Sequence, residues 1–183
     1  MKNITFIVGS LRKQSFNRQL ATLAEKMLSD RYNITYLEFE DVPLMNQDME
    51  ADAPAAVRRV REEILAADGI WIFTPEYNFS YPGLLKNLFD WLSRPMDIRD
   101  FKNPSAVVGK KVTVSGAGGQ NQTASCRAKL NELLEFIQMQ VMKEPQTGIA
   151  LGVEAWTKGE FNLTTEQIAQ LEEQAERFAE FVG

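Results

Sequence analysis

Short apolar segments alternate along this chain with longer segments in which apolar residues recur at helical spacing. The segments that are rich in apolar or β-branched residues, each short enough to be a strand, span residues 4–8, 34–39, 70–73, 111–115 (through Val112 and Val114) and 139–142. A capping box at Thr164 and Gln167 predicts a last helix near the C-terminus. Alternation of this kind builds a parallel sheet with helices on both faces. We therefore predict an α/β fold, a three-layer sandwich around a five-stranded parallel sheet, with residues 1–183 in one domain.

The loop after the first predicted strand has the composition of a phosphate-binding loop. Gly9 permits a sharp turn, and Ser15 is placed to cap the helix that follows. A helix N-terminus favours an anion, because its first N–H groups are unpaired and its dipole is positive there. Ser10, Arg12 and Asn17 would supply further donors. The glycine patterns of triphosphate and dinucleotide sites are missing, so we predict a monophosphate. Taken singly, these residues also fit an ordinary helix cap and solvated loop charges.

Two further polar loops follow the third and fourth predicted strands. Residues 74–83 combine a fixed proline turn with amide, carboxylate and aromatic groups that suit a flat ring. Residues 115–121 are small and polar, which lets backbone N–H groups approach a ligand closely. Each loop could also be a plain connection between a strand and a helix. In residues 74–83, Phe79 and Tyr81 would then pack into the core. With the strand order 2-1-3-4-5, however, all three loops meet at the carboxyl edge of the sheet, where ligands bind.

Composition and charge exclude several classes of function. The formal net charge of -5 argues against a nucleic-acid partner. No apolar stretch is long enough to span a membrane, and the first strand begins too early for a signal peptide, which predicts a cytoplasmic protein. Cys126 is the single cysteine and has no partner for a disulfide within the chain. The chain has no histidine, so an enzyme of this sequence would depend on a cofactor for its chemistry, and no metal site is predicted.

Three features leave structural and functional alternatives open. The apolar loop at residues 43–50 could contact a ligand, a partner subunit or the core. The charges between Arg58 and Glu63, which include Arg61, are predicted to form the solvated face of a helix that Pro54 opens. Trp91 could belong to the core or to an interface.

Three motifs together resemble the NAD(P)H-dependent FMN reductases of the flavodoxin-like superfamily, which include bacterial quinone, azo-dye and chromate reductases. The motifs are Gly9-Ser10-Leu11-Arg12 with Ser15-Phe16-Asn17, then Pro75-Glu76-Tyr77-Asn78 with Pro82-Gly83-Leu84-Leu85-Lys86-Asn87 and Asp90-Trp91-Leu92, and more loosely Ser115-Gly116 with Gly118-Gly119. The resemblance implies a flavodoxin-like fold. It also implies that FMN is held at its phosphate by the first loop, at its ring by the second and in a pocket completed by the third. The cofactor-binding residues so implied are Ser10, Arg12, Ser15, Phe16, Asn17, Pro75, Glu76, Tyr77, Asn78, Ser115, Gly116 and Gly119.

The resemblance also implies an activity and an assembly. NADPH or NADH would pass hydride to FMN, which would then reduce a quinone, azo compound, metal oxyanion or free flavin in a ping-pong cycle. No side chain is assigned as catalytic, because hydride transfer needs no general base. A homodimer or homotetramer is expected. Residues 123–128 depart from the glycine pair that many relatives have there. The alternatives are a flavodoxin-type electron carrier and a flavin-binding regulatory protein, neither with efficient NAD(P)H turnover.

Overall fold

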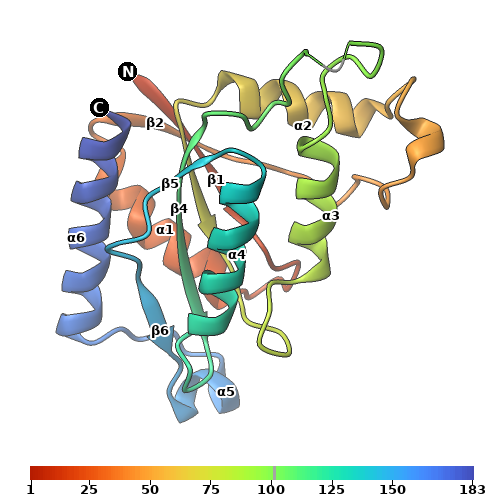
Figure 1. Ribbon diagram of the computed structural model, residues 1–183. Coiled ribbons are helices and arrows are strands. Elements are labelled where there is room, and N and C mark those ends of the chain that lie inside the picture. The colour runs from red at the N-terminus through yellow and green to blue at the C-terminus, as the bar shows by residue number, and fades with distance from the viewer. Residues whose placement is uncertain (101) are drawn as a thin grey trace.

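The computed structural model describes residues 1–100 and 102–183, which form a parallel sheet between two layers of helices (Figure 1). The sheet has the strand order β2-β1-β3-β4-β5, as predicted. Its strands are β1 (Lys2–Val8), β2 (Tyr32–Tyr36), β3 (Gly69–Phe73), β4 (Lys111–Gly118) and β5 (Gln140–Val141). Every pair of neighbouring strands on this path is parallel. The flavodoxin-like fold class is therefore confirmed.

The helices cover the sheet because successive side chains of each buried strand point to opposite faces. Trp71 and Phe73 of β3 pack under α1 (Phe16–Leu28) and α6 (Thr165–Val182). Ile70 and Ile72 of the same strand pack in a second cluster on the other face. That cluster is covered by α2 (Ala55–Ala66), α3 (Gly83–Leu92) and α4 (Ala124–Phe136). Among the described residues, no helix has the length and apolar character that a membrane crossing requires.

The fifth position of the sheet is divided between two short strands. Strand β6 (Gly148–Ala150) pairs with the end of β4, beyond the point where β5 stops. Accordingly β4 runs to Gly118, so the prediction of a loop from residue 115 is wrong at its start. A short helix, α5 (Val153–Lys158), lies between β6 and the last helix, where no element was predicted from the sequence. Strand β6 was missed because three residues are too few to show a period.

The apolar loop at residues 43–50 packs against α2 and α3 and contains a 3-10 turn, η1 (Gln47–Met49). Trp91 is fully buried, and its Nε1 donates to the carbonyl of Pro43 at 2.8 Å, so the core interpretation is correct. Arg61 is also buried and donates to the carbonyl of Trp91 at 3.1 Å. The prediction that Arg61 is solvated is therefore wrong, because α2 faces α3 as well as the sheet.

Candidate functional site

The loops after β1, β3 and β4 lie at the end of the sheet where α5 also lies (Figure 1). Residues of these loops line one cavity of about 120 Å³. Its lining residues are Ser10, Arg12, Ser15, Phe16, Asn17, Pro75, Glu76, Tyr77, Ala117, Gly118, Gly119, Leu151 and Trp156. The convergence predicted for the three loops is thus confirmed. Of the predicted site residues, Asn78, Ser115 and Gly116 do not line this cavity.

The N-terminus of α1 forms the base of the first loop. Ser15 has an extended backbone and its hydroxyl accepts a hydrogen bond from the N–H of Arg18 at 3.2 Å, so it caps the helix as predicted. Phe16 is buried beside it, and the Arg12 guanidinium lies 4.7 Å from the centroid of the Phe16 ring. This contact keeps a cation close to the helix N-terminus while leaving its N–H donors open to a ligand.

Asn17 joins the N-terminus of α1 to the end of β4. Its Nδ2 donates to the carbonyl of Ala117 at 3.0 Å, and its Oδ1 accepts from the N–H of Ala117 at 2.8 Å. Both bonds are buried, so the side chain pairs with β4 as a neighbouring strand would. The structure therefore gives Asn17 a role in holding the site together, which the sequence did not indicate.

Glu76 joins the second loop to the start of α4. Its carboxylate accepts from the N–H of Cys126 at 2.8 Å and from the side-chain amide of Asn121 at 2.9 Å. Thr123, the residue before α4, gives no side-chain cap of its own. Glu76, from a separate loop, supplies the negative charge that this helix N-terminus lacks.

Burial raises the pKa of the neighbouring Cys126 thiol to about 11, so the thiol is neutral at physiological pH.

The second loop ends in a tight hairpin tip. Tyr77 and Ser80 exchange both backbone hydrogen bonds, at 2.9 and 3.0 Å, around Asn78 and Phe79. Both tip residues have positive φ, 52° and 59°, a conformation that an aromatic residue rarely adopts. The turn leaves Phe79 66% exposed, so the alternative that Phe79 packs into the core is wrong.

Ser115 and Gly116 lie inside β4, behind the cavity. The Ser115 hydroxyl is fully buried, donates to Gln174 Oε1 at 2.7 Å and accepts from Trp71 Nε1 at 2.9 Å. A Cβ on Gly116 would stand 2.3 Å from Thr123 Oγ1 and 2.5 Å from the carbonyl oxygen of Thr74. Glycine is required there so that the second and third loops can pack against β4.

Two cavity residues come from a part of the chain that sequence reasoning passed over. Leu151 is buried just after β6, and Trp156 of α5 contacts Phe16 edge to face with 6.2 Å between ring centroids. The sequence carries a signal for α5. Glu154 lies in its first turn, Lys158 lies in its last, and Gly159 follows with φ of 76°, as is typical at a helix C-terminus.

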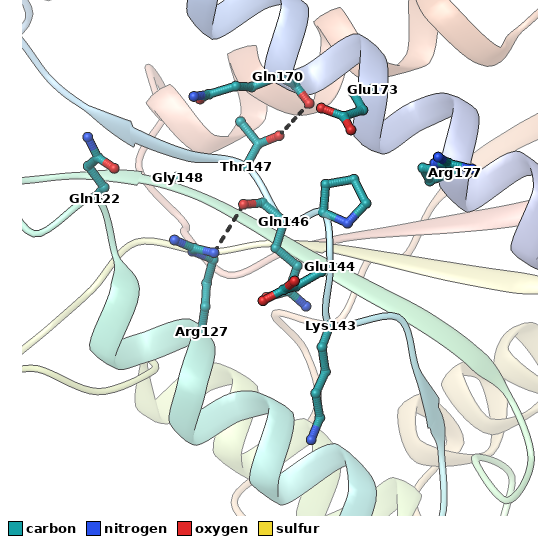
Figure 2. A pocket seen from close by; sticks show the side chains of 11 residues that line it. Gln122, Arg127, Lys143, Glu144, Gln146, Thr147, Gly148, Gln170, Glu173 and Arg177 are labelled. Carbon is teal, nitrogen blue, oxygen red and sulfur yellow. Dashed lines mark hydrogen bonds between the residues drawn. The ribbon is translucent and has the colours of Figure 1, made fainter.

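A larger cavity lies elsewhere, between α4, α6 and residues 143–148 (Figure 2). It measures about 830 Å³ and contains none of the predicted residues. Cations and carboxylates line it together, and two of the cations already pair with neighbouring carboxylates. Lys143 contacts Glu135 at 2.8 Å and Arg177 contacts Glu180 at 3.1 Å. The smaller cavity, with a helix N-terminus and three converging loops, is the better candidate for a ligand site.

Comparisons with known proteins agree on one family. The model of the NADPH-dependent FMN reductase family matches residues 2–154. The chain is 35% identical over 144 residues to a 2-hydroxy-1,4-benzoquinone reductase of a Burkholderia species, covering 78% of this chain and 75% of that protein. A quinone reductase of Escherichia coli is 36% identical over 147 residues, covering 78% and 74%.

A solved structure leads to the same family. The flavoenzyme FerB of Paracoccus denitrificans, an NAD(P)H:(acceptor) oxidoreductase, superimposes with a TM-score of 0.86 and 32% identity. The match covers 100% of this chain and 97% of that one. On this fold, these loops and these similarities, the chain belongs to the NADPH-dependent FMN reductase family and is an oxidoreductase that uses FMN and NAD(P)H.

Proposed function

We propose that this protein passes electrons from NADPH or NADH through FMN to a small-molecule acceptor in a ping-pong cycle. A quinone is the first acceptor to test, followed by azo compounds, metal oxyanions and free flavin. The observation that supports the proposal most is the cavity at the carboxyl edge of the sheet, where three loops and the N-terminus of α1 come together. Proteins of this fold bind ligands at that place.

The residues around the cavity fit FMN. Ser10, Arg12 and the first turn of α1 offer hydroxyl, guanidinium and backbone N–H donors, the set that a phosphate needs. Pro75, Tyr77 and Trp156 offer apolar surface to a flat ring. The cavity volume of about 120 Å³ is below the roughly 300–1,000 Å³ of typical ligand pockets, so the cavity encloses only part of an FMN molecule.

The assembly of the chain into a homodimer or homotetramer stays a prediction, which sedimentation would test.

In this proposal the chain's residues bind and orient, and bound FMN supplies the hydride and electron chemistry. Gly119, in the loop after β4, lines the cavity, and its backbone N–H can donate to negative charge that develops on a ligand. Asn17 ties the N-terminus of α1 to β4, and Glu76 ties the loop after β3 to the start of α4, so these two side chains hold the elements around the cavity together. No side chain is assigned a proton transfer, in keeping with the absence of histidine from the sequence.

The visible absorption spectrum tests the proposal. Purified protein mixed with FMN should show a bound flavin spectrum, which NADPH or NADH should bleach under anaerobic conditions and a quinone should restore. Steady-state rates at several quinone concentrations should give the parallel double-reciprocal lines of a ping-pong cycle. A bound flavin that neither nicotinamide bleaches would show that the proposed activity is wrong.

Arg12→Ala should weaken FMN binding by about 1.5 to 3 kcal/mol, because it removes a charge-assisted bond to the phosphate. The measurement is a fluorescence titration of FMN at fixed ionic strength. Lys13→Ala is the matched control, since Lys13 is an exposed cation in the same loop that does not line the cavity. Equal FMN affinities for the two variants would refute the role of Arg12.

A further inference from the structure

The sheet is interrupted between β5 and β6, directly beside the middle of β4. The chain leaves the sheet after Val141 and returns to it at Gly148. The N–H of Met142 donates to the carbonyl of Val112 at 2.8 Å, and the N–H of Gly116 donates to the carbonyl of Thr147 at 3.0 Å. Between these two bonds, residues 113–115 of β4 face no strand in the fifth position. Their buried polar groups need other partners.

One side chain of α6 meets that need. Gln174 is fully buried, and its Oε1 accepts from the N–H of Thr147 at 2.6 Å and from the Ser115 hydroxyl at 2.7 Å. Its Nε2 donates to Thr113 Oγ1 at 2.8 Å and to the carbonyl of Val114 at 3.1 Å. The amide thereby takes the place of the missing strand and uses both of its N–H donors and its carbonyl.

The segment that leaves the sheet is held by helices on both sides (Figure 2). Arg127 of α4 donates to the carbonyl of Gln146 at 3.1 Å, and the side-chain amides of Asn131 and Gln146 pair at 3.0 and 3.2 Å. On the other side, the Thr147 hydroxyl donates to the carbonyl of Gln170 in α6 at 3.2 Å. Among the helix side chains that hold this segment, Gln174 also bonds to β4, so it adds a side-chain connection between the segment and the sheet to the direct backbone bonds at Met142 and Thr147.

A continuous chain of contacts leads from Gln174 to the candidate site. Gln174 fixes Thr147, the residue before β6, and β6 then pairs in the register Gly116↔Gly148. Leu151 follows and donates its N–H to the carbonyl of Gly118 at 2.8 Å. Leu151 and Trp156 of the adjoining α5 form one wall of the cavity. A shift at Thr147 would therefore move that wall, although Gln174 itself does not line the cavity.

We propose that Gln174 is a positioning residue for the flavin site, holding β6 in register on β4 and thereby placing the wall formed by Leu151 and Trp156. The inference rests on the proposed function, because the wall is taken to contact bound FMN. The simpler reading is that Gln174 only stabilises the fold. The two readings differ in where a substitution acts: the proposal places its effect in β6 and the cavity wall, whereas a stabilising role spreads it over the sheet.

Hydrogen exchange measured by mass spectrometry tests the local effect without a ligand. Gln174→Met keeps the length of the side chain but leaves the N–H of Thr147 and the carbonyl of Val114 without their partners. Exchange over residues 147–151 should become about tenfold faster or more, while β1 and β3 keep their protection. Gln170→Met is the matched control, because it makes the same change one turn earlier at an exposed position of α6. Equal acceleration in all strands would overturn the proposal.

A double-mutant cycle on FMN affinity tests the link to the site. Gln174→Met should weaken FMN binding by about tenfold in the wild-type background and by much less in Trp156→Ala, where the wall is already lost. Additive effects would overturn the proposal. Unchanged affinity in Gln174→Met, with wild type binding FMN, would overturn this inference alone. Failure of wild type itself to bind FMN would overturn the proposed function.

A milder variant covers the case in which Gln174→Met does not fold. Thr113→Val keeps the shape of the side chain but removes the hydroxyl that accepts from Gln174 and donates to the carbonyl of Met142 at 3.2 Å. Faster exchange confined to residues 147–151, with weaker FMN binding, supports the proposal. Loss of protection throughout the sheet, or no change in residues 147–151, refutes it.

Discussion

Replacing Glu50 by alanine is expected to lower the free energy of unfolding by about 3 kcal/mol, the lower end of the cost of breaking a buried ion pair, because Glu50 is buried while its partner Arg94 is partly exposed. The Glu50 side chain is 3% exposed and lies at the end of the apolar loop that packs on α2 and α3. Its carboxylate pairs with Arg94, with Nε to Oε1 and Nη2 to Oε2 distances both of 3.0 Å.

Arg61 makes the loss of Glu50 more costly. Arg61 is buried, and burial lowers the pKa of its guanidinium, an effect that the charge of Glu50 opposes. Without Glu50, two cations, Arg61 and Arg94, remain close together in the protein with no carboxylate to balance them. The loop at residues 43–50 would lose the contact that ties its end to Arg94, just after α3.

Urea unfolding of the protein without FMN measures the effect. Glu176→Ala is the matched control, because Glu176 makes two bonds to Arg31, at 2.7 and 3.0 Å, on the surface. Exposed pairs of that kind contribute at most about 1 kcal/mol. If Glu50→Ala cost no more than Glu176→Ala, the buried network would not stabilise the fold as argued.

The sequence predicted the fold because β1 and β3 are largely buried on both faces and are rich in apolar and β-branched residues. It failed where small residues form a strand. Gly116 and Gly118 have the composition of a loop, yet they belong to β4. The strand has glycine at these two positions because the Thr123 side chain occupies the space that a Cβ there would need. Strand β6 owes its place to its pairing with β4 and to Gln174, partners that are distant in the sequence.

The loops of the site could be predicted, but the partners of their side chains could not. Composition marks the loops after β1 and β3 as polar and placed at strand ends. Asn17, however, bonds to a backbone group 100 residues away, and Glu76 to one 50 residues away. One signal was present and passed over: Gln174 is a polar residue on the buried stripe of α6, between Leu171 and Phe178. A glutamine at such a position must find polar partners inside the protein.

Asn17→Ala is expected to lower the free energy of unfolding by about 2 to 4 kcal/mol, because it leaves the N–H and the carbonyl of Ala117 buried without partners. FMN binding should weaken as well, since the same two bonds hold the N-terminus of α1 against the end of β4. Urea unfolding without ligand and a fluorescence titration of FMN measure the two effects separately.

Asn33→Ala is the control, because the Asn33 amide bonds to Asn3 at 3.0 Å at an exposed position, where water can replace it. That variant should change stability by less than about 0.5 kcal/mol. The comparison separates the two roles open to Asn17. If Asn17→Ala loses FMN affinity but is as stable as Asn33→Ala, Asn17 acts as a phosphate donor. If it loses stability even without FMN, its pairing with Ala117 is what shapes the site.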